Sequence, residues 1–126
     1  MRILGLSFQF HDAAATVVED DKILYASHSE RYSKIKNDAF LNHEMISDCL
    51  RFGKPDVIVL HEKSFVKKLR NIYAGNWSAL REHSMTAWIK EFFPELAGIP
   101  IKSYWHHETH AAAGVLTSKF DDAAVM

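Results

Sequence analysis

Short apolar runs separated by turn-forming residues dominate the beginning of the chain. The run at residues 2–7 has the length of a buried strand, and a second apolar run spans residues 13–19. An acidic pair at residues 20–21 follows, and such pairs tolerate the backbone conformations of tight turns. With a third run at residues 22–29, the pattern predicts a β-hairpin over residues 14–29.

The middle of the chain changes to helical spacing. After a loop through residues 37–38, the pattern predicts a helix over residues 42–52, closed by Gly53 at the place of a left-handed cap. Pro55 blocks continuation of this helix, and the apolar residues 56–60 predict a strand.

Helices and strands alternate in the rest of the chain. We expect helices over residues 64–73 and 76–93, a strand over 99–104, a helix from 105 to about 117 and the start of a strand at 122–126. The order β-β-β-α-β-α-α-β-α-β predicts an α/β fold with a mixed sheet and helices packed on it. Because the last apolar run has only begun at the end, we expect residues 1–126 to form a single N-terminal subdomain, truncated at its C-terminal end.

Composition excludes several classes of function. The net charge of −1, from 15 basic and 16 acidic residues, argues against a nucleic-acid or membrane partner. No apolar run approaches the roughly 20 residues that a membrane span needs. Cys49 is the only cysteine, so an internal disulfide is excluded and we expect a cytoplasmic protein with a buried thiol.

Residues 105–114 carry the clearest chemical signal, because three histidines precede a small-residue helical stretch. His106 and His110 are four residues apart, so on a helix they share a face and can reach one metal ion. His107 points elsewhere and is a candidate hydrogen-bond donor to a substrate, or it packs under the sheet edge. The alternative for the pair is a surface feature, since eight histidines produce some clustering by chance. The histidines without any partner pattern are His28, His43, His61 and His83.

Three separated segments, in one order, match a known family. They are residues 3–7 with 11–15 (Ile-Leu-Gly-Leu-Ser and His-Asp-Ala-Ala-Ala), residues 29–38 (Ser-Glu-Arg-Tyr-Ser-Lys-Ile-Lys-Asn-Asp), and residues 106–113 with 120–125. Together they resemble the N-terminal region of the O-carbamoyltransferase family, which includes the nodulation-factor (NodU-type) and aminoglycoside-antibiotic carbamoyltransferases.

The resemblance implies a fold of the actin, sugar-kinase and heat-shock ATPase type (ribonuclease H-like), with paired α/β subdomains and nucleotide in the cleft. It implies a transferase that makes carbamoyl-adenylate from carbamoyl phosphate and ATP, with Mg²⁺, and passes the carbamoyl group to the hydroxyl of a small-molecule acceptor. The implied partners are these substrates and the missing C-terminal half of the enzyme.

Roles for individual residues follow from the same resemblance. His106 and His110 match the family's metal-binding pair, and the implied ion is divalent, iron in the known cases. The remaining ligands would come from outside this segment. His11 matches the histidine that takes a proton from the acceptor hydroxyl, and Asp12 either orients it or caps the turn.

The stretch from Arg31 to Lys36 matches a phosphate-binding region. Lys36 is the best candidate to bind phosphate, and Arg31 can grip phosphate with two bonds, although a run of charges is also typical of a solvated loop. Two residues depart from the family pattern: Ser29 replaces a glutamate, and Asn37 replaces a histidine.

Two other functions stay open. Threonylcarbamoyl-transferring tRNA-modifying proteins carry a comparable histidine pair, but the His-Asp turn and the absence of a basic face argue against them. A short or split polypeptide of this fold, acting as a regulatory or assembly partner without turnover, is the second. In either case we expect the 126 residues alone to be inactive.

Overall fold

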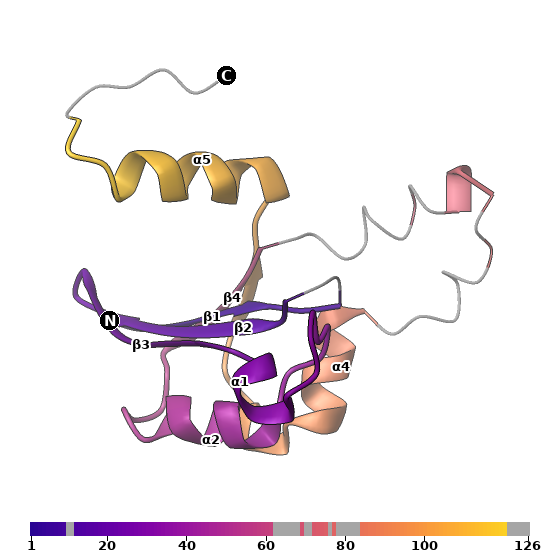
Figure 1. Cartoon of the computed structure of the whole chain (residues 1–126), viewed down its shortest axis with the longest axis horizontal. Coiled ribbons are helices and arrows are strands. Elements are labelled where there is room, and N and C mark those ends of the chain that lie inside the picture. The colour runs from indigo at the N-terminus through magenta and orange to yellow at the C-terminus, as the bar shows by residue number, and fades with distance from the viewer. Residues whose placement is uncertain (10–11, 62–68, 70–71, 76, 78–83, 121–126) are drawn as a thin grey trace.

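The structure is a computed structural model that describes residues 1–9, 12–61, 69, 72–75, 77 and 84–120. It shows an α/β fold in which a five-stranded mixed sheet carries helices on both sides (Figure 1). The strands are β1 (Arg2–Ser7), β2 (Ala14–Glu19), β3 (Lys22–His28), β4 (Val57–Leu60) and β5 (Ile101–Ser103). The α-helices in the described part of the chain are α1 (Glu30–Ser33), α2 (His43–Leu50), α4 (Met85–Phe92) and α5 (His106–Leu116).

The sheet combines a hairpin meander with parallel strands, in the order β3-β2-β1-β4-β5. β2 runs antiparallel to both β1 and β3, whereas β1, β4 and β5 are parallel to one another. The predicted hairpin is confirmed, and Asp20 and Asp21 form its turn with φ of 46° and 66°. Acidic residues tolerate this left-handed region better than most side chains do.

Successive side chains of a strand point to opposite faces of the sheet, so every second apolar residue faces the same core. Figure 1 shows α2 and α4 on one side of the sheet and α5 on the other. The buried side chains of the strands and of α2 and α4 form the core; they include Leu4, Leu6, Ala15, Val17, Ile58, Leu60, Met45, Ile46, Cys49, Met85 and Ile89. The expected burial of Cys49 is confirmed. By contrast, α5 contains no buried residue.

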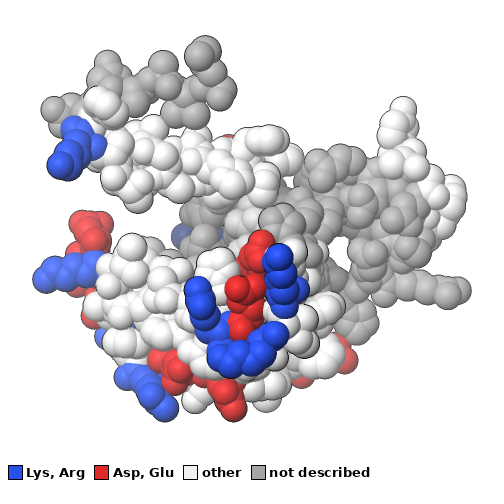
Figure 2. Space-filling view, viewed as in Figure 1, with Lys and Arg blue, Asp and Glu red and all other residues white. Residues whose placement is uncertain are grey.

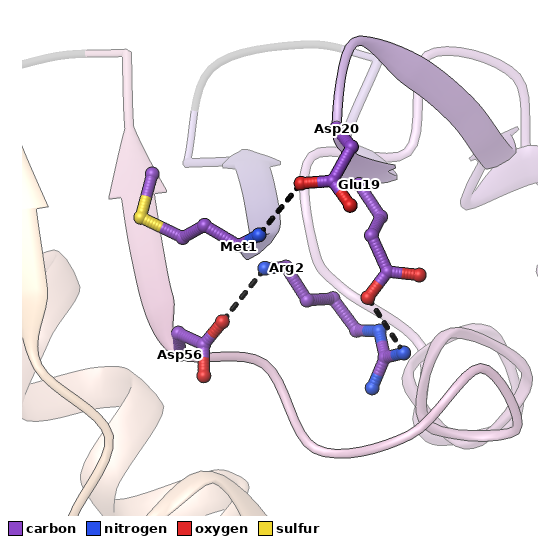
Figure 3. A network of polar contacts seen from close by, with 5 residues as sticks. All are labelled: Met1, Arg2, Glu19, Asp20 and Asp56. Carbon is purple, nitrogen blue, oxygen red and sulfur yellow. Dashed lines mark hydrogen bonds and ion pairs between the residues drawn. The ribbon is translucent and has the colours of Figure 1, made fainter.

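Polar contacts hold the end of the sheet where β1 begins (Figure 3). The amino group of Met1 pairs with Asp20 at 2.8 Å, and the Arg2 guanidinium pairs with Glu19 at 2.8 Å. The backbone N–H of Arg2 donates to Asp56 at 2.7 Å. These contacts fasten β1 to the β2–β3 turn and to the segment that enters β4.

Capping residues decided the helix boundaries. α2 lies within the predicted range, with the Asn42 side chain accepting from the N–H of Glu44 at 2.8 Å, and Gly53 has the expected positive φ, 103°. Within the range predicted as one helix, residues 76–93, α4 begins at Met85, because Ser84 is extended and its hydroxyl accepts from the N–H of Ala87 at 3.2 Å. Residues 76 and 78–83 of that range lie outside the described residues. A serine cap of this kind ends a helix on its N-terminal side whatever the apolar spacing further upstream.

Three further expectations differ from the structure or cannot be compared with it. The segment expected as a loop after β3 contains the one-turn helix α1, and the strand predicted over residues 99–104 is confined to β5. Most of the helix predicted over residues 64–73, and the strand predicted at 122–126, lie outside the described residues. Among the described helices, none has both the length and the apolar character needed to cross a membrane.

Candidate active site

Three parallel strands end at one edge of the sheet. In the register of the sheet, Leu6 of β1 lies opposite Leu60 of β4, and Leu60 lies opposite Ser103 of β5. The N–H of Tyr104 donates to the carbonyl of Leu60 at 3.1 Å, which extends this alignment beyond β5. In open α/β sheets, ligands bind outside the carboxyl ends of such strands.

The hairpin strands β2 and β3 bring further segments to the same edge of the sheet. Ser7 at the end of β1 pairs with Ala14 at the start of β2, and Ala14 pairs with His28 at the end of β3. The β1–β2 turn, the segment after β3 and the segment leading into α5 therefore all join the sheet here. In Figure 1, α1 lies on the face of the sheet that carries α2 and α4, and α5 lies on the opposite face. The sheet thus gathers all three segments that the sequence singled out.

Backbone hydrogen bonds hold the β1–β2 turn against the segment after β3. The N–H of Gln9 donates to Ala39 and that of Ala13 to Asp38, each at 2.7 Å. The N–H of Ser29 closes the arrangement by donating to the carbonyl of Ala13, also at 2.7 Å. Gln9 and Ala13 are therefore neighbours of residues 38–39, which follow the cationic stretch.

Of the two residues proposed to act from the β1–β2 turn, His11 and Asp12, the structure describes only Asp12. His11 lies outside the described residues. Asp12 is half-buried and has a φ of 53°, a conformation that aspartate tolerates because its short side chain can hydrogen-bond locally. The choice between orienting His11 and capping the turn therefore stays a prediction.

The cationic stretch runs through α1 and the residues that follow it. Arg31, Lys34 and Lys36 are exposed, and Lys34 Nζ donates to the carbonyl of Arg31 at 2.7 Å. In the face shown in Figure 2, Lys and Arg side chains are interspersed with Asp and Glu, so the local charge is mixed. Within the described residues, neither Arg31 nor Lys36 forms an ion pair, which leaves both cations available to an anion.

The departures from the family pattern have local structural reasons. Ser29 is fully buried and its hydroxyl donates to the carbonyl of Phe40 at 2.5 Å, so the site accommodates a small hydroxyl group in place of a long carboxylate. Asn37 has a φ of 56°, a region that asparagine enters more readily than most residues. Its N–H donates to Glu30 Oε2 at 3.2 Å and so returns the chain toward α1.

A polar anchor that the sequence analysis missed fixes α1 to the rest of the fold. The Tyr32 hydroxyl donates to Asp48 Oδ2 in α2 at 2.6 Å and forms a hydrogen bond with the Tyr25 hydroxyl in β3. Burial, reinforced by these hydrogen bonds, raises the pKa of Tyr32 well above its ordinary value. No local pattern marks this contact, because Tyr32 and Asp48 are 16 residues apart and on different elements.

The histidine pair has the geometry of two ligands on one ion. The Nε2 atoms of His106 and His110 lie 3.1 Å apart, and their rings are nearly perpendicular, at 85°. Two nitrogen ligands with metal–nitrogen bonds of about 2.1 Å and an angle of roughly 90–110° lie about 3.0–3.4 Å apart. The first turn is held by Glu108, which accepts from the N–H of Trp105 at 3.2 Å, and by Thr109, which donates to the carbonyl of His106 at 2.7 Å.

The neighbours of this pair are two further histidines. His107 is exposed, and its ring centre lies 5.8 Å from that of His106. His61, for which the sequence shows no partner pattern, follows β4 and places its ring centre 5.6 Å from that of His106. In the part of the chain that the structure describes, no three metal-binding side chains already surround one point. The sequence expectation that the pair needs further ligands therefore stands as a prediction.

Comparisons with known proteins give one relative of interest. No family model matches the chain. A protein of Synechocystis sp. that carries the name "Uncharacterized protein sll1178" is 32% identical over 150 aligned positions, which cover 98% of this chain and 24% of the relative. The chain thus spans about a quarter of the length of that relative.

Proposed function

We propose that this chain is the N-terminal part of an ATP-dependent O-carbamoyltransferase. Such an enzyme forms carbamoyl-adenylate from carbamoyl phosphate, water and ATP with release of phosphate and pyrophosphate, and transfers the carbamoyl group to a substrate hydroxyl with AMP as the leaving group. The observation that carries the proposal is the convergence of the three family-like segments on one sheet edge. The strand order β3-β2-β1-β4-β5, with a meander followed by parallel strands, supports a subdomain of the actin and sugar-kinase type.

The histidine pair supplies the metal-binding part of the proposed site. Its Nε2 separation of 3.1 Å fits cis ligands, so His106 and His110 would hold a divalent ion, iron by family resemblance. A bound ion acts as a Lewis acid that stabilises negative charge on a phosphoryl or carbamoyl oxygen. His107 is exposed beside the pair and would donate a hydrogen bond to such an oxygen.

The cationic stretch supplies the anion-binding part. Lys36 and Arg31 project exposed charges from a segment anchored through Tyr32, so their backbone positions are set before a ligand arrives. They would bind the phosphate of carbamoyl phosphate or of the adenylate by charge-assisted hydrogen bonds. His11 would take the proton from the acceptor hydroxyl during transfer, with Asp12 beside it in the turn.

Binding of carbamoyl phosphate tests the anion site without requiring turnover. In calorimetric titrations of the chain, Lys36→Ala should weaken binding at least about tenfold, since a hydrogen bond to a charged group contributes about 1.5–3 kcal/mol. Lys54→Ala is the matched control, because Lys54 is an exposed lysine in the segment that enters β4, away from the carboxyl edge. Equal affinities of the wild type and Lys36→Ala would remove Lys36 from the site.

Turnover distinguishes an enzyme region from a non-catalytic fragment. Pyrophosphate release from ATP, dependent on carbamoyl phosphate, should be absent with the 126 residues alone and present when the remainder of the reading frame is included. Absence of release in both preparations would contradict the enzyme assignment and favour a regulatory or assembly role.

A further inference from the structure

His61 occupies a position that the sequence pattern does not reveal. It is the first residue after β4, the strand that lies between β1 and β5. Leu60, which precedes it, accepts the hydrogen bond from the N–H of Tyr104, two residues before the helix that carries the histidine pair. Adjacent strands lie about 4.8 Å apart, so His61 and the entry to α5 leave the sheet side by side.

The ring of His61 approaches that of His106 at nearly the distance that two ligands of one ion require. Two imidazoles on one ion have ring centres about 4.6–5.3 Å apart for metal–nitrogen bonds of about 2.1 Å. The His106–His110 separation is 4.5 Å, and the His61–His106 separation is 5.6 Å with an interplanar angle of 63°. A small rotation of the half-buried His61 side chain closes the remaining difference of about 0.3 Å beyond that range.

The two ring nitrogens of a histidine differ in their access to solvent, which bears on which of them would bind the ion. The Nδ1 atoms of His61 and His106 are both inaccessible to solvent, whereas His106 Nε2 faces His110 Nε2. In the proposed site the ligand atom of His61 would likewise be Nε2, the atom that His106 and His110 direct toward each other. Histidine ligands of this type favour ions such as Fe²⁺, Co²⁺ and Zn²⁺ over Mg²⁺, which prefers oxygen ligands.

We propose that His61 is a third protein ligand of the ion held by His106 and His110, an inference that rests on the metal pair of the proposed function. The third bond would connect the end of β4 to α5, a helix in which no residue is fully buried. Metal binding then has a structural consequence: it docks α5 on the sheet edge and stabilises the folded chain by mass action.

A titration of the wild-type chain with Zn²⁺, followed by long-range ¹H–¹⁵N spectra of the imidazoles, tests the proposal directly. Nε2 resonances of His61, His106 and His110 should all shift on saturation, while those of His28 and His43 stay in place. Shifts of His106 and His110 alone would overturn the role of His61 and leave the metal pair intact. No shift of any of the three would contradict the metal pair of the proposed function itself.

Affinity measurements on variants give an independent test. His61→Ala should weaken Co²⁺ binding at least about tenfold, the lower limit for loss of a residue that only supports a ligand, and should reduce the d–d absorption of the bound ion. His28→Ala is the matched control, because His28 is an exposed histidine at the same edge of the sheet. Unchanged Co²⁺ affinity in His61→Ala would overturn the proposal, and if this variant does not fold, the wild-type spectra decide it.

Discussion

Replacing Tyr32 by phenylalanine removes the hydroxyl that connects α1 to β3 and α2. The principal loss is the 2.6 Å hydrogen bond to Asp48, and hydrogen bonds to charged groups contribute about 1.5–3 kcal/mol. Asp48 is partly exposed and keeps its contact with Arg51 at 3.3 Å, which places the expected loss in the lower half of this range, about 1.5–2 kcal/mol. The midpoint of thermal unfolding should fall by about 6–8 °C for a domain of this size.

The pH dependence of this variant provides a second measurement. Burial raises the pKa of Tyr32 above its ordinary value of 10.0, so the folded state holds the proton more tightly than the unfolded state does. The resulting stability is fully present below pH 10.0 and declines as the pH rises above that value. The wild type should therefore lose stability more steeply than Tyr32→Phe above this pH, so the difference between them shrinks.

Urea unfolding of both proteins, read by circular dichroism across this pH range, measures the two effects. Tyr73→Phe is the control, since it makes the same chemical change at a side chain that is 96% exposed. A free energy of unfolding for Tyr32→Phe within about 0.3 kcal/mol of the wild type would refute the assignment of Tyr32 as an anchor.

Two other predictions concern groups near α2. Gly53→Ala should destabilise the fold by about 1–2 kcal/mol, because φ is 103° and an added Cβ would lie 2.2 Å from Arg2 Nη1, displacing the guanidinium from Glu19. In thermal unfolding, Gly53→Ala should lose more stability than Gly98→Ala, because Gly98 has a φ of 78° but open space around it. Equal losses of stability in the two variants would show that displacement of Arg2 adds nothing to the effect. The thiol of Cys49 should react with a disulfide reagent at least about a hundredfold more slowly in the native than in the urea-unfolded chain, because burial and the nearby Asp48 raise its pKa from 9.0 to about 12. Rapid native labelling would contradict its burial.

The sequence predicted the local elements well wherever one repeating pattern covers the whole element. The β-hairpin, the strand β4 and the helix α5 follow from apolar runs, an acidic turn and a small-residue helical stretch. The same local reasoning placed His106 and His110 on one face, since the positions of residues four apart on a helix are set by its geometry alone. The prediction of one continuous helix over residues 76–93 failed at residue 84, where an extended serine caps the start of α4.

Contacts between residues far apart in the chain could not be predicted from the sequence, because no periodic pattern of residues indicates them. The contact of Tyr32 with Asp48 joins two helices, and the approach of His61 to His106 joins segments that follow two neighbouring parallel strands. Each depends on which strands pair and in what register, and that is settled by packing of the whole core.

The chain by itself therefore indicated which residues are candidates for a functional site and which of them share a local element. Only the tertiary structure decided that the turn after β1, the cationic stretch after β3 and the histidine helix after β5 meet at one edge, with His61 among them. The physical reason is the sheet register: strands aligned to bury Leu4, Leu6, Ile58 and Leu60 also align the residues that follow them.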